Sequence, residues 1–236
     1  MDSSNYKLSM QTIQYNNDAV TKLKEGKAIE AFHLLSKACR AAHDAAHNDD
    51  DSNCNRMYQY TWLDCSKALA HKMKGTRSFN DGSLPFLFLQ FLWIEPPMEY
   101  CSPMEEDMEE EEMSVHVRGF IWVLWYNLAI VSILLGNPVE ARGHRLLKQS
   151  LDLFRLVQSV VDPQPLSKHW VILKLSILNN EACVLSELSE SRQRLDRLIK
   201  MGLALSSLSD MLDPEDREQF IWTVKSMADD RFAAAA

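Results

Sequence analysis

The sequence predicts an all-α protein of about seven helices, arranged as antiparallel hairpins, with one inserted extended segment. Three observations support this. The 236 residues include only seven glycines and eight prolines, which favours long helices over many short strands joined by turns. Residues with high helix propensity (Leu, Ala, Met, Glu, Lys and Arg) are plentiful. Finally, a pattern typical of a helix–turn–helix unit recurs along the chain.

The net charge of −8 comes almost entirely from one segment. Residues Glu95 to Glu112 contain nine acidic side chains and no basic one. Outside this segment, 24 acidic residues face 25 basic ones, so the remainder is nearly neutral. No run of Lys and Arg offers a stripe for phosphates, and nucleic acid is therefore not an expected partner.

The five cysteines are an odd number without close pairs, and residues 1–11 lack the apolar core of a secretory signal. Both features favour a reducing, intracellular compartment, either cytoplasmic or nuclear.

A pattern of about 25 residues occurs twice in full and once in a decayed form. In each full copy an aromatic residue, an asparagine, an alanine, a glycine and a Glu-Ala pair follow one another at the same spacing. The matched positions are Tyr15, Asn17, Ala19, Gly26, Glu30 and Ala31 in the first copy, Trp125, Asn127, Ala129, Gly136, Glu140 and Ala141 in the second, and Leu178, Asn180 and Ala182 in the third, where Ser189 stands at the glycine position and Arg194 at the second alanine position.

This spacing suits a helical hairpin. Gly26 and Gly136 are expected where a helix ends and the chain turns, which glycine permits through positive φ. The alanines on either side of the turn allow two antiparallel helices to approach closely. Asn127 falls in the middle of a helix, so we expect its amide to reach a neighbouring backbone group.

These residues resemble the tetratricopeptide repeat (TPR), a helix-turn-helix unit that stacks into a superhelix with a concave binding face. The resemblance covers Tyr15–Ala38, Trp125 to about Ser150 and, more weakly, Leu178–Leu198. The copies are 110 and 53 residues apart, whereas a tight array repeats at about 34. Arg145 and Lys148 also stand where the family usually has an aromatic and a small residue. The chain thus resembles a degenerate, interrupted TPR protein, and an ordinary all-α domain is the alternative.

Helical periodicity, capping residues and prolines set the expected element boundaries. Asn137 is predicted to cap a helix whose first residue is Pro138. Helices are expected over residues 11–25, 27–46, 56–74, 115–135, from 138 to the turn at 162–165, from a cap at Ser167 to 188, over 190–209 and from 214 to 231.

An insertion at residues 75–113 interrupts the helices. Pro85 to Ile94 is dense in Phe, Leu, Ile and Trp and is bounded by prolines, which favours an extended strand. Residues 104–113 form a block of like charge, typical of a disordered acidic loop. The expected organisation is a flexible N-terminus at 1–10, a single TPR-like helical domain over 11–232 that contains this insertion, and a tail at 233–236.

The apolar segment is expected to pack back against the helices. Eight of its ten residues are large and apolar, and each would stabilise the fold by about 1.5–3 kcal/mol on full burial. We expect it to fill part of the groove between the first and second repeat-like units, with the acidic loop at its edge. The alternative is pairing with a strand of a partner or of another copy.

A membrane span is not expected, although Gly119 to Gly136 is strongly apolar. Its 18 residues are at the lower limit for crossing a bilayer. Asn127 lies in its middle, and the segment matches the repeat. A buried helix of a repeat protein is the better interpretation.

No catalytic signature is found, so neither enzymatic activity nor a cofactor is expected. There is no Gly-rich phosphate loop, no Gly-x-Ser-x-Gly and no His-Glu-x-x-His. The alternative function is a metal-binding or catalytic protein that uses Cys39, His43 and His47. These residues are spaced four apart on one helix face, and thiolate and imidazole suit zinc. Surface histidines near a helix end explain the same pattern.

The resemblance implies that the first helix of each hairpin lines a groove. The positions it implies are Ile13, Asn16, Val20 and Leu23, then Val123, Tyr126, Ile130 and Ile133, then Ser176, Asn179 and Cys183. None is Lys or Arg, which disfavours a clamp for a terminal carboxylate and favours a protein or peptide with apolar anchors. The alternative is that many of these side chains belong to the core. The function expected is that of a protein-interaction scaffold or adaptor.

Overall fold

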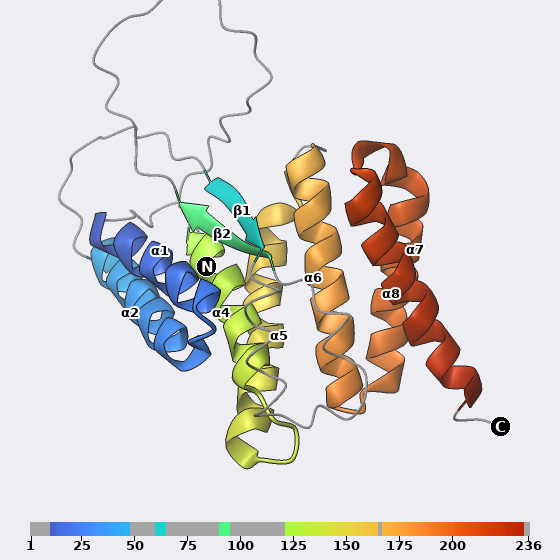
Figure 1. The fold of residues 1–236 in the computed structure, drawn as a ribbon, viewed down its shortest axis with the longest axis horizontal. Helices are drawn as coiled ribbons and strands as arrows, with labels where there is room; N and C mark the ends of the chain where they lie inside the picture. The colour runs from blue at the N-terminus through green and yellow to red at the C-terminus, as the bar shows by residue number, and fades with distance from the viewer. Residues whose placement is uncertain (1–9, 48–59, 65–89, 95–120, 165–166, 234–236) are drawn as a thin grey trace, which may run out of the picture. The chain divides into compact units, whose positions relative to one another are not determined.

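A computed structural model describes residues 10–47, 60–64, 90–94, 121–164 and 167–233 (Figure 1). Seven α-helices and two short strands are found in these ranges, which confirms the mainly helical fold. The elements are α1 (Met10–Lys24), α2 (Ala28–His47), β1 (Tyr60–Asp64), β2 (Gln90–Ile94), α4 (Ile121–Leu135), α5 (Ala141–Val161), α6 (Lys168–Glu187), α7 (Ser191–Leu208), the short 3-10 helix η3 (Ser209–Met211) and α8 (Pro214–Ala233).

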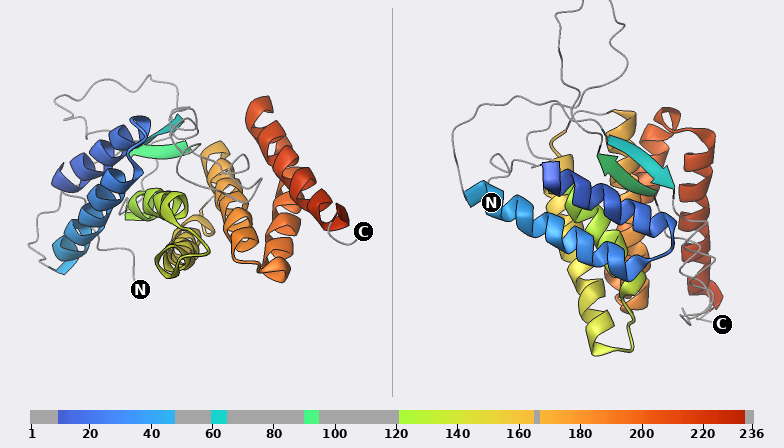
Figure 2. Two further views of the ribbon diagram at one scale, coloured as in Figure 1. Left: turned by 60° about the horizontal axis from the view of Figure 1, so that its bottom comes forward. Right: turned by 60° about the vertical axis from the view of Figure 1, so that its left-hand side comes forward.

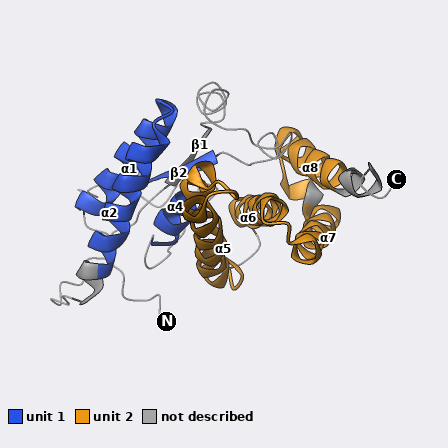
Figure 3. Ribbon diagram, turned by 90° about the horizontal axis from the view of Figure 1, so that it is seen from below, with its two compact units in different colours: residues 1–69, 90–128 blue, residues 70–89, 129–236 orange. Residues whose placement is uncertain are grey.

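The described residues form two compact units, coloured separately in Figure 3. The boundary falls inside α4, between Leu128 and Ala129. Unit 1 contains α1, α2, β1, β2 and the first part of α4, and unit 2 contains the rest of α4 with α5 to α8. The single domain over residues 11–232 stays a prediction.

In unit 1, α1 and α2 form the antiparallel hairpin that the first repeat copy predicts (Figures 1 and 2). Gly26 has a φ of 70° and ends α1. Its N–H donates to Leu23 O, and the N–H of Lys27 donates to Lys22 O. Two such bonds around a left-handed residue define a Schellman cap, which satisfies the last carbonyls of the helix. Ala19 and Ala31, on either side of the turn, are fully buried as expected.

The same unit contains a two-stranded antiparallel sheet, in which Tyr60 pairs with Ile94 and Asp64 with Gln90. The extended segment predicted at 85–94 is confirmed for Gln90–Ile94. The helix predicted over residues 56–74 is wrong at Tyr60–Asp64, which is strand β1. The sequence YTWLD combines aromatic and β-branched residues. Such residues favour a strand once a partner strand is available.

In unit 2, the turn between α4 and α5 differs from the prediction. Gly136 follows the end of α4 but does not have positive φ. A Cβ there would lie 2.6 Å from Leu147 Cδ2, so Gly136 is needed for space. Asn137 is not the N-cap, because α5 begins at Ala141 with Glu140 in the capping position. The Oδ1 of Asn137 instead accepts from the N–H of Val139, at 3.0 Å.

This longer turn changes which residue allows close packing in the second copy. Ala141 is exposed, so it does not play the part of Ala31. Gly143 is buried, and a Cβ there would overlap the backbone of Asn137. The small residue that packs tightly is therefore Gly143.

The α6–α7 hairpin repeats the turn of α1–α2. Ser189 has a φ of 59°, rare for a residue other than glycine. Its N–H donates to Ser186 O, and the N–H of Glu190 donates to Leu185 O. These are the two bonds found around Gly26, so the segment that resembles a third copy has the same turn without a glycine.

The remaining boundaries agree with the sequence to within a few residues. Ser167 is the N-cap residue of α6, although its side chain makes no capping hydrogen bond. Residue Pro214 begins α8 as predicted. Among the described helices, none combines the length and apolar character needed to span a bilayer. Met10, expected in the flexible N-terminus at 1–10, begins α1, and Ala233, expected in the tail at 233–236, ends α8. The rest of these two segments, residues 85–89 and the acidic loop 104–113 lie outside the described residues.

Candidate functional site

Three buried asparagines in unit 1 surround strand β2. Asn16 and Asn17 come from α1, and Asn127 comes from the middle of α4. A buried side-chain amide is costly unless it is hydrogen-bonded. All three find partners on the same strand, which lies beside α1 and α4 in Figures 1 and 2.

Asn17 clamps the main chain of Ile94. Its Nδ2 donates to Ile94 O at 2.6 Å, and the N–H of Ile94 donates to its Oδ1 at 3.0 Å. The side-chain amide therefore replaces the N–H and C=O that a neighbouring strand would offer. A main-chain clamp of this kind does not depend on the side chain that it holds, provided that the residue has an N–H.

Asn127 clamps Leu92 in the same way, two residues earlier. The N–H of Leu92 donates to Asn127 Oδ1 at 2.9 Å, and Asn127 Nδ2 donates to Leu92 O at 2.8 Å. Asn16 Nδ2 also donates to Leu92 O, at 3.0 Å. The amide of Asn127 thus reaches a backbone group, as its mid-helix position predicts.

Side-chain bonds link the three asparagines to one another. Asn127 Nδ2 donates to Asn16 Oδ1 at 2.8 Å, and Asn16 Nδ2 donates to Asn17 Oδ1 at 3.2 Å. Each amide is thus oriented by its neighbours as well as by β2. We call Asn16, Asn17 and Asn127 the asparagine clamp.

Strand β2 uses both of its edges. Main-chain groups alternate in direction along a strand, so Leu92 and Ile94 turn toward the clamp while the intervening residues turn toward β1. The side chains of Phe91, Leu92 and Ile94 are fully buried, and those of Gln90 and Trp93 are half-buried. Gln90–Ile94 therefore packs against helices, as expected, through its bonds to α1 and α4. That it fills part of a groove between repeat-like units stays a prediction.

The predicted groove residues are buried. None of the eleven positions is more than 2% exposed; six lie in unit 1 and five in unit 2. Those in unit 1 are Ile13, Asn16, Val20, Leu23, Val123 and Tyr126, and those in unit 2 are Ile130, Ile133, Ser176, Asn179 and Cys183. The structure brings Asn16 together with β2, whereas Val20 and Leu23 belong to the core. Contact of these positions with a partner stays a prediction.

The α6–α7 hairpin has an asparagine pair at the same place. Asn179 and Asn180 are fully buried, and Asn179 Nδ2 donates to Asn180 Oδ1 at 3.1 Å, as Asn16 does to Asn17. Each pair ends nine residues before the left-handed residue of its turn. The repeated Asn-Asn dipeptide was the sequence signal for this site, and only its second member was assigned a place in the repeat pattern.

Unit 2 also contains a buried carboxylate that joins three helices. Glu181 on α6 is 1% exposed. Its Oε2 lies 2.7 Å from Arg197 Nε of α7, as an ion pair, and accepts a hydrogen bond from Gln158 Nε2 of α5 at 3.2 Å. Burial raises the pKa of Glu181, while Arg197 and Gln158 act in the opposite direction. The net direction is upward, so the loss of hydration outweighs the attraction of its partners.

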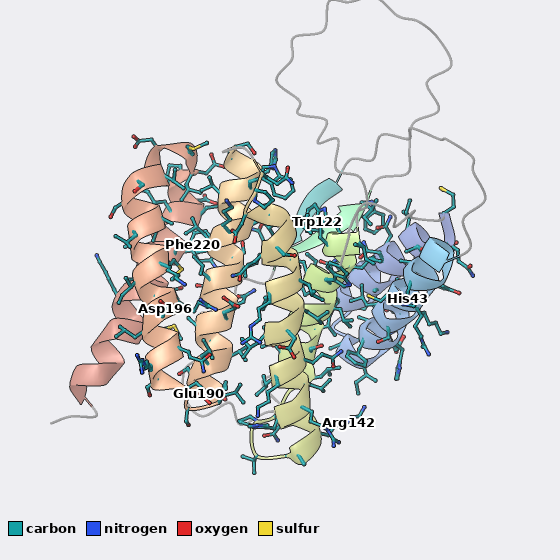
Figure 4. All side chains as sticks on the ribbon, turned by 180° about the vertical axis from the view of Figure 1, so that it is seen from behind. His43, Trp122, Arg142, Glu190, Asp196 and Phe220 are labelled. Carbon is teal, nitrogen blue, oxygen red and sulfur yellow. The ribbon has the colours of Figure 1, made fainter. Side chains whose placement is uncertain are left out.

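The alternative site at Cys39, His43 and His47 gains no support from the geometry. His43 is exposed on α2 (Figure 4), and the side chain of His47 lies outside the described residues. Burial raises the pKa of the Cys39 thiol to about 12, so the thiol is protonated at neutral pH in the absence of a metal. Within the described ranges, no three His, Cys, Asp or Glu side chains are grouped to hold a metal.

Comparisons with known proteins give no match to a family model, a curated protein or a solved structure.

Proposed function

We propose that this chain is a protein-interaction scaffold of degenerate TPR-like hairpins, which holds an extended segment of a partner through main-chain contacts and apolar anchors. The observation that carries the proposal is the asparagine clamp. Helices α1 and α4 hold an extended strand by its main chain, and main-chain hydrogen bonds are one of the ways in which proteins bind extended peptides.

The repetition of the Asn-Asn pair and of the turn that follows it supports a TPR-like scaffold. The α1–α2 and α6–α7 hairpins have the same Asn-Asn bond and the same Schellman turn, with φ values of 70° and 59°. Two hairpins that share both features are what an array of diverged repeats would contain. They also argue that the asparagine pair serves a role common to the hairpins.

The thiols support an intracellular site of action. Cys39 and Cys183 are free, and burial raises the pKa of both. Disulfides are rare in a reducing compartment, and free cysteines are the usual state there.

Affinity purification with quantitative mass spectrometry tests the proposal. We compare the native chain with Asn17→Ala, which removes both bonds to Ile94, and with Gln14→Ala, an exposed position on the same helix. The native chain and Gln14→Ala are expected to retain the same partners, and Asn17→Ala to recover them at least ten-fold less.

Both variants are first matched for abundance and for their helical circular dichroism. Absence of any enriched protein with the native chain would reject the scaffold function. Equal recovery with all three chains would mean that binding, if present, does not involve the clamp.

A further inference from the structure

We infer that β2 occupies a binding site for extended segments, and that a partner binds by placing an extended segment of the same pattern in the asparagine clamp instead of β2. The pattern is two apolar residues separated by one residue. Neither of the two is proline, so each has a main-chain N–H to donate to the clamp. This inference rests on the proposed function and defines the partner segment that the asparagine clamp accepts.

The asparagine clamp bonds only to main-chain atoms of β2. The hydrogen bonds from Asn16, Asn17 and Asn127 to β2 all involve the N–H and C=O groups of Leu92 and Ile94. No side-chain polar atom of β2 takes part in them. The clamp therefore recognises the main chain of an extended segment, at two residues that are separated by one residue.

The second step concerns the side chains of the ligand. Leu92 and Ile94, at the clamped positions, are fully buried. Phe91, which pairs with Leu63 of β1, is also fully buried. A charged or strongly polar residue at either clamped position would be buried without a partner. Proline is excluded at both positions, because it has no N–H to donate.

The third step concerns exchange. Buried amides left without partners are unfavourable, so an empty clamp is not a stable state. A partner segment that offers the same four main-chain atoms satisfies the amides as β2 does. The α1–α2 hairpin, which provides two of the three asparagines, is closed by its own Schellman turn and buried alanines. It does not need β2 for its own turn, so the α1–α2 hairpin can stay folded while one segment replaces another in the clamp.

The test uses the full chain with Leu92→Pro. This change removes the N–H that donates to Asn127 Oδ1 and leaves the clamp residues unaltered. The probe is a fluorescent peptide with the sequence of residues 87–95, flanked by lysines for solubility. We expect Leu92→Pro to bind the peptide at least ten-fold more tightly than the native chain, as measured by fluorescence anisotropy.

Two controls link the binding to the clamp. A peptide with proline in place of the residue equivalent to Ile94 should not bind. Adding Asn17→Ala to the Leu92→Pro chain should reduce the affinity for the unmodified peptide at least ten-fold. A folded Leu92→Pro chain that does not bind the peptide, or binds both peptides equally, overturns the inference.

A second measurement applies if Leu92→Pro loses its helical signal. Hydrogen exchange at the amides of Leu92 and Ile94 is then followed in the native chain with and without excess peptide. Faster exchange with the peptide supports displacement of β2, and unchanged exchange rejects it. Partners that still depend on Asn17 in affinity purification, together with a negative peptide result, would keep the scaffold function and reject only this ligand class.

Discussion

Asn17 and Ile94 are joined by two hydrogen bonds in opposite directions, at 2.6 and 3.0 Å, although 77 residues separate them in the sequence. A side chain of α1 thus satisfies both main-chain groups of one strand residue. Because the amide is 8% exposed and Ile94 is fully buried, water has little access to these groups. The pair should therefore contribute strongly to the stability of unit 1.

The first prediction concerns this pair. Asn17→Ala leaves the N–H and C=O of Ile94 without their partner, and we expect the free energy of unfolding to fall by about 2–4 kcal/mol, since each such group costs roughly 1–3 kcal/mol. Urea unfolding followed by circular dichroism measures the change. Gln14→Ala, on the exposed face of α1, should stay within about 0.5 kcal/mol of the native chain. Equal effects of the two substitutions would show that the bonds to Ile94 are not important for stability.

The second prediction concerns the two Schellman turns. Ser189 and Gly26 share a left-handed φ, 59° and 70°, but only Gly26 adopts it without a Cβ. Ser189→Gly should therefore raise the free energy of unfolding by about 1 kcal/mol, and Gly26→Ala should lower it by about 1–2 kcal/mol. Thermal and urea unfolding of the two variants show whether each substitution raises or lowers the free energy of unfolding. A destabilised Ser189→Gly would contradict the argument, unless its hydroxyl is required, which Ser189→Ala would reveal.

Much of the hairpin structure follows from local sequence. The turn after a helix can be predicted from local sequence, because one residue must adopt a φ outside the helical range. Gly26 can do so because it has no Cβ. The asparagine at 127 could be expected to bond to a backbone group, because an amide inside an apolar helix needs a partner. The identity of that partner, Leu92, could not be read, because it is set by the folding of a segment 35 residues away.

The errors arise where tertiary contacts compete with local patterns. Tyr60–Asp64 fits a helical period, yet its pairing with β2 decides its conformation. Asn137 has the local features of an N-cap, but α5 begins only at Ala141, and the turn between them brings the backbone of Asn137 against Gly143. The pairing of β1 with β2 and the contact between Gly143 and Asn137 depend on how the chain folds, so they cannot be predicted from local patterns in one sequence.

The third prediction uses the glycines of unit 2. Gly143→Ala places a Cβ into the backbone of Asn137, which cannot move aside as a flexible side chain can. We expect a loss of about 2–3 kcal/mol in the free energy of unfolding, as for other overpacked sites. Gly136→Ala should cost less, about 1–2 kcal/mol, because the Leu147 side chain that it meets can adjust.

Gly202 in α7 is the matched control for these substitutions. A Cβ there meets nothing within 4 Å. Gly202→Ala should therefore stabilise the chain by about 0.5–1 kcal/mol, through the higher helix propensity of alanine. If all three alanine variants shifted the urea midpoint in the same direction, the packing explanation for Gly136 and Gly143 would be wrong.

The fourth prediction concerns the pH dependence of the Glu181–Arg197 pair. Burial raises the folded-state pKa of Glu181 above its usual value of 4.5. A carboxyl with a raised pKa binds more protons in the folded than in the unfolded state. Its contribution to stability is therefore present below the unfolded pKa and is lost as the pH rises through the folded pKa.

Arg197→Met removes the largest attraction on this carboxylate, so the pKa of Glu181 should rise further. We expect the variant to lose about 3 kcal/mol at pH 7.5, the lower end of the range for breaking a buried pair, since Arg197 is 20% exposed. At pH 4.5 the loss should be clearly smaller, because Glu181 is then largely protonated in the folded chain. Glu181→Gln added to Arg197→Met should recover most of the stability at pH 7.5, because no buried charge remains. Urea unfolding of the single and double variants at both pH values measures this, and a pH-independent loss would show that Arg197 acts through packing of its side chain and not through its charge.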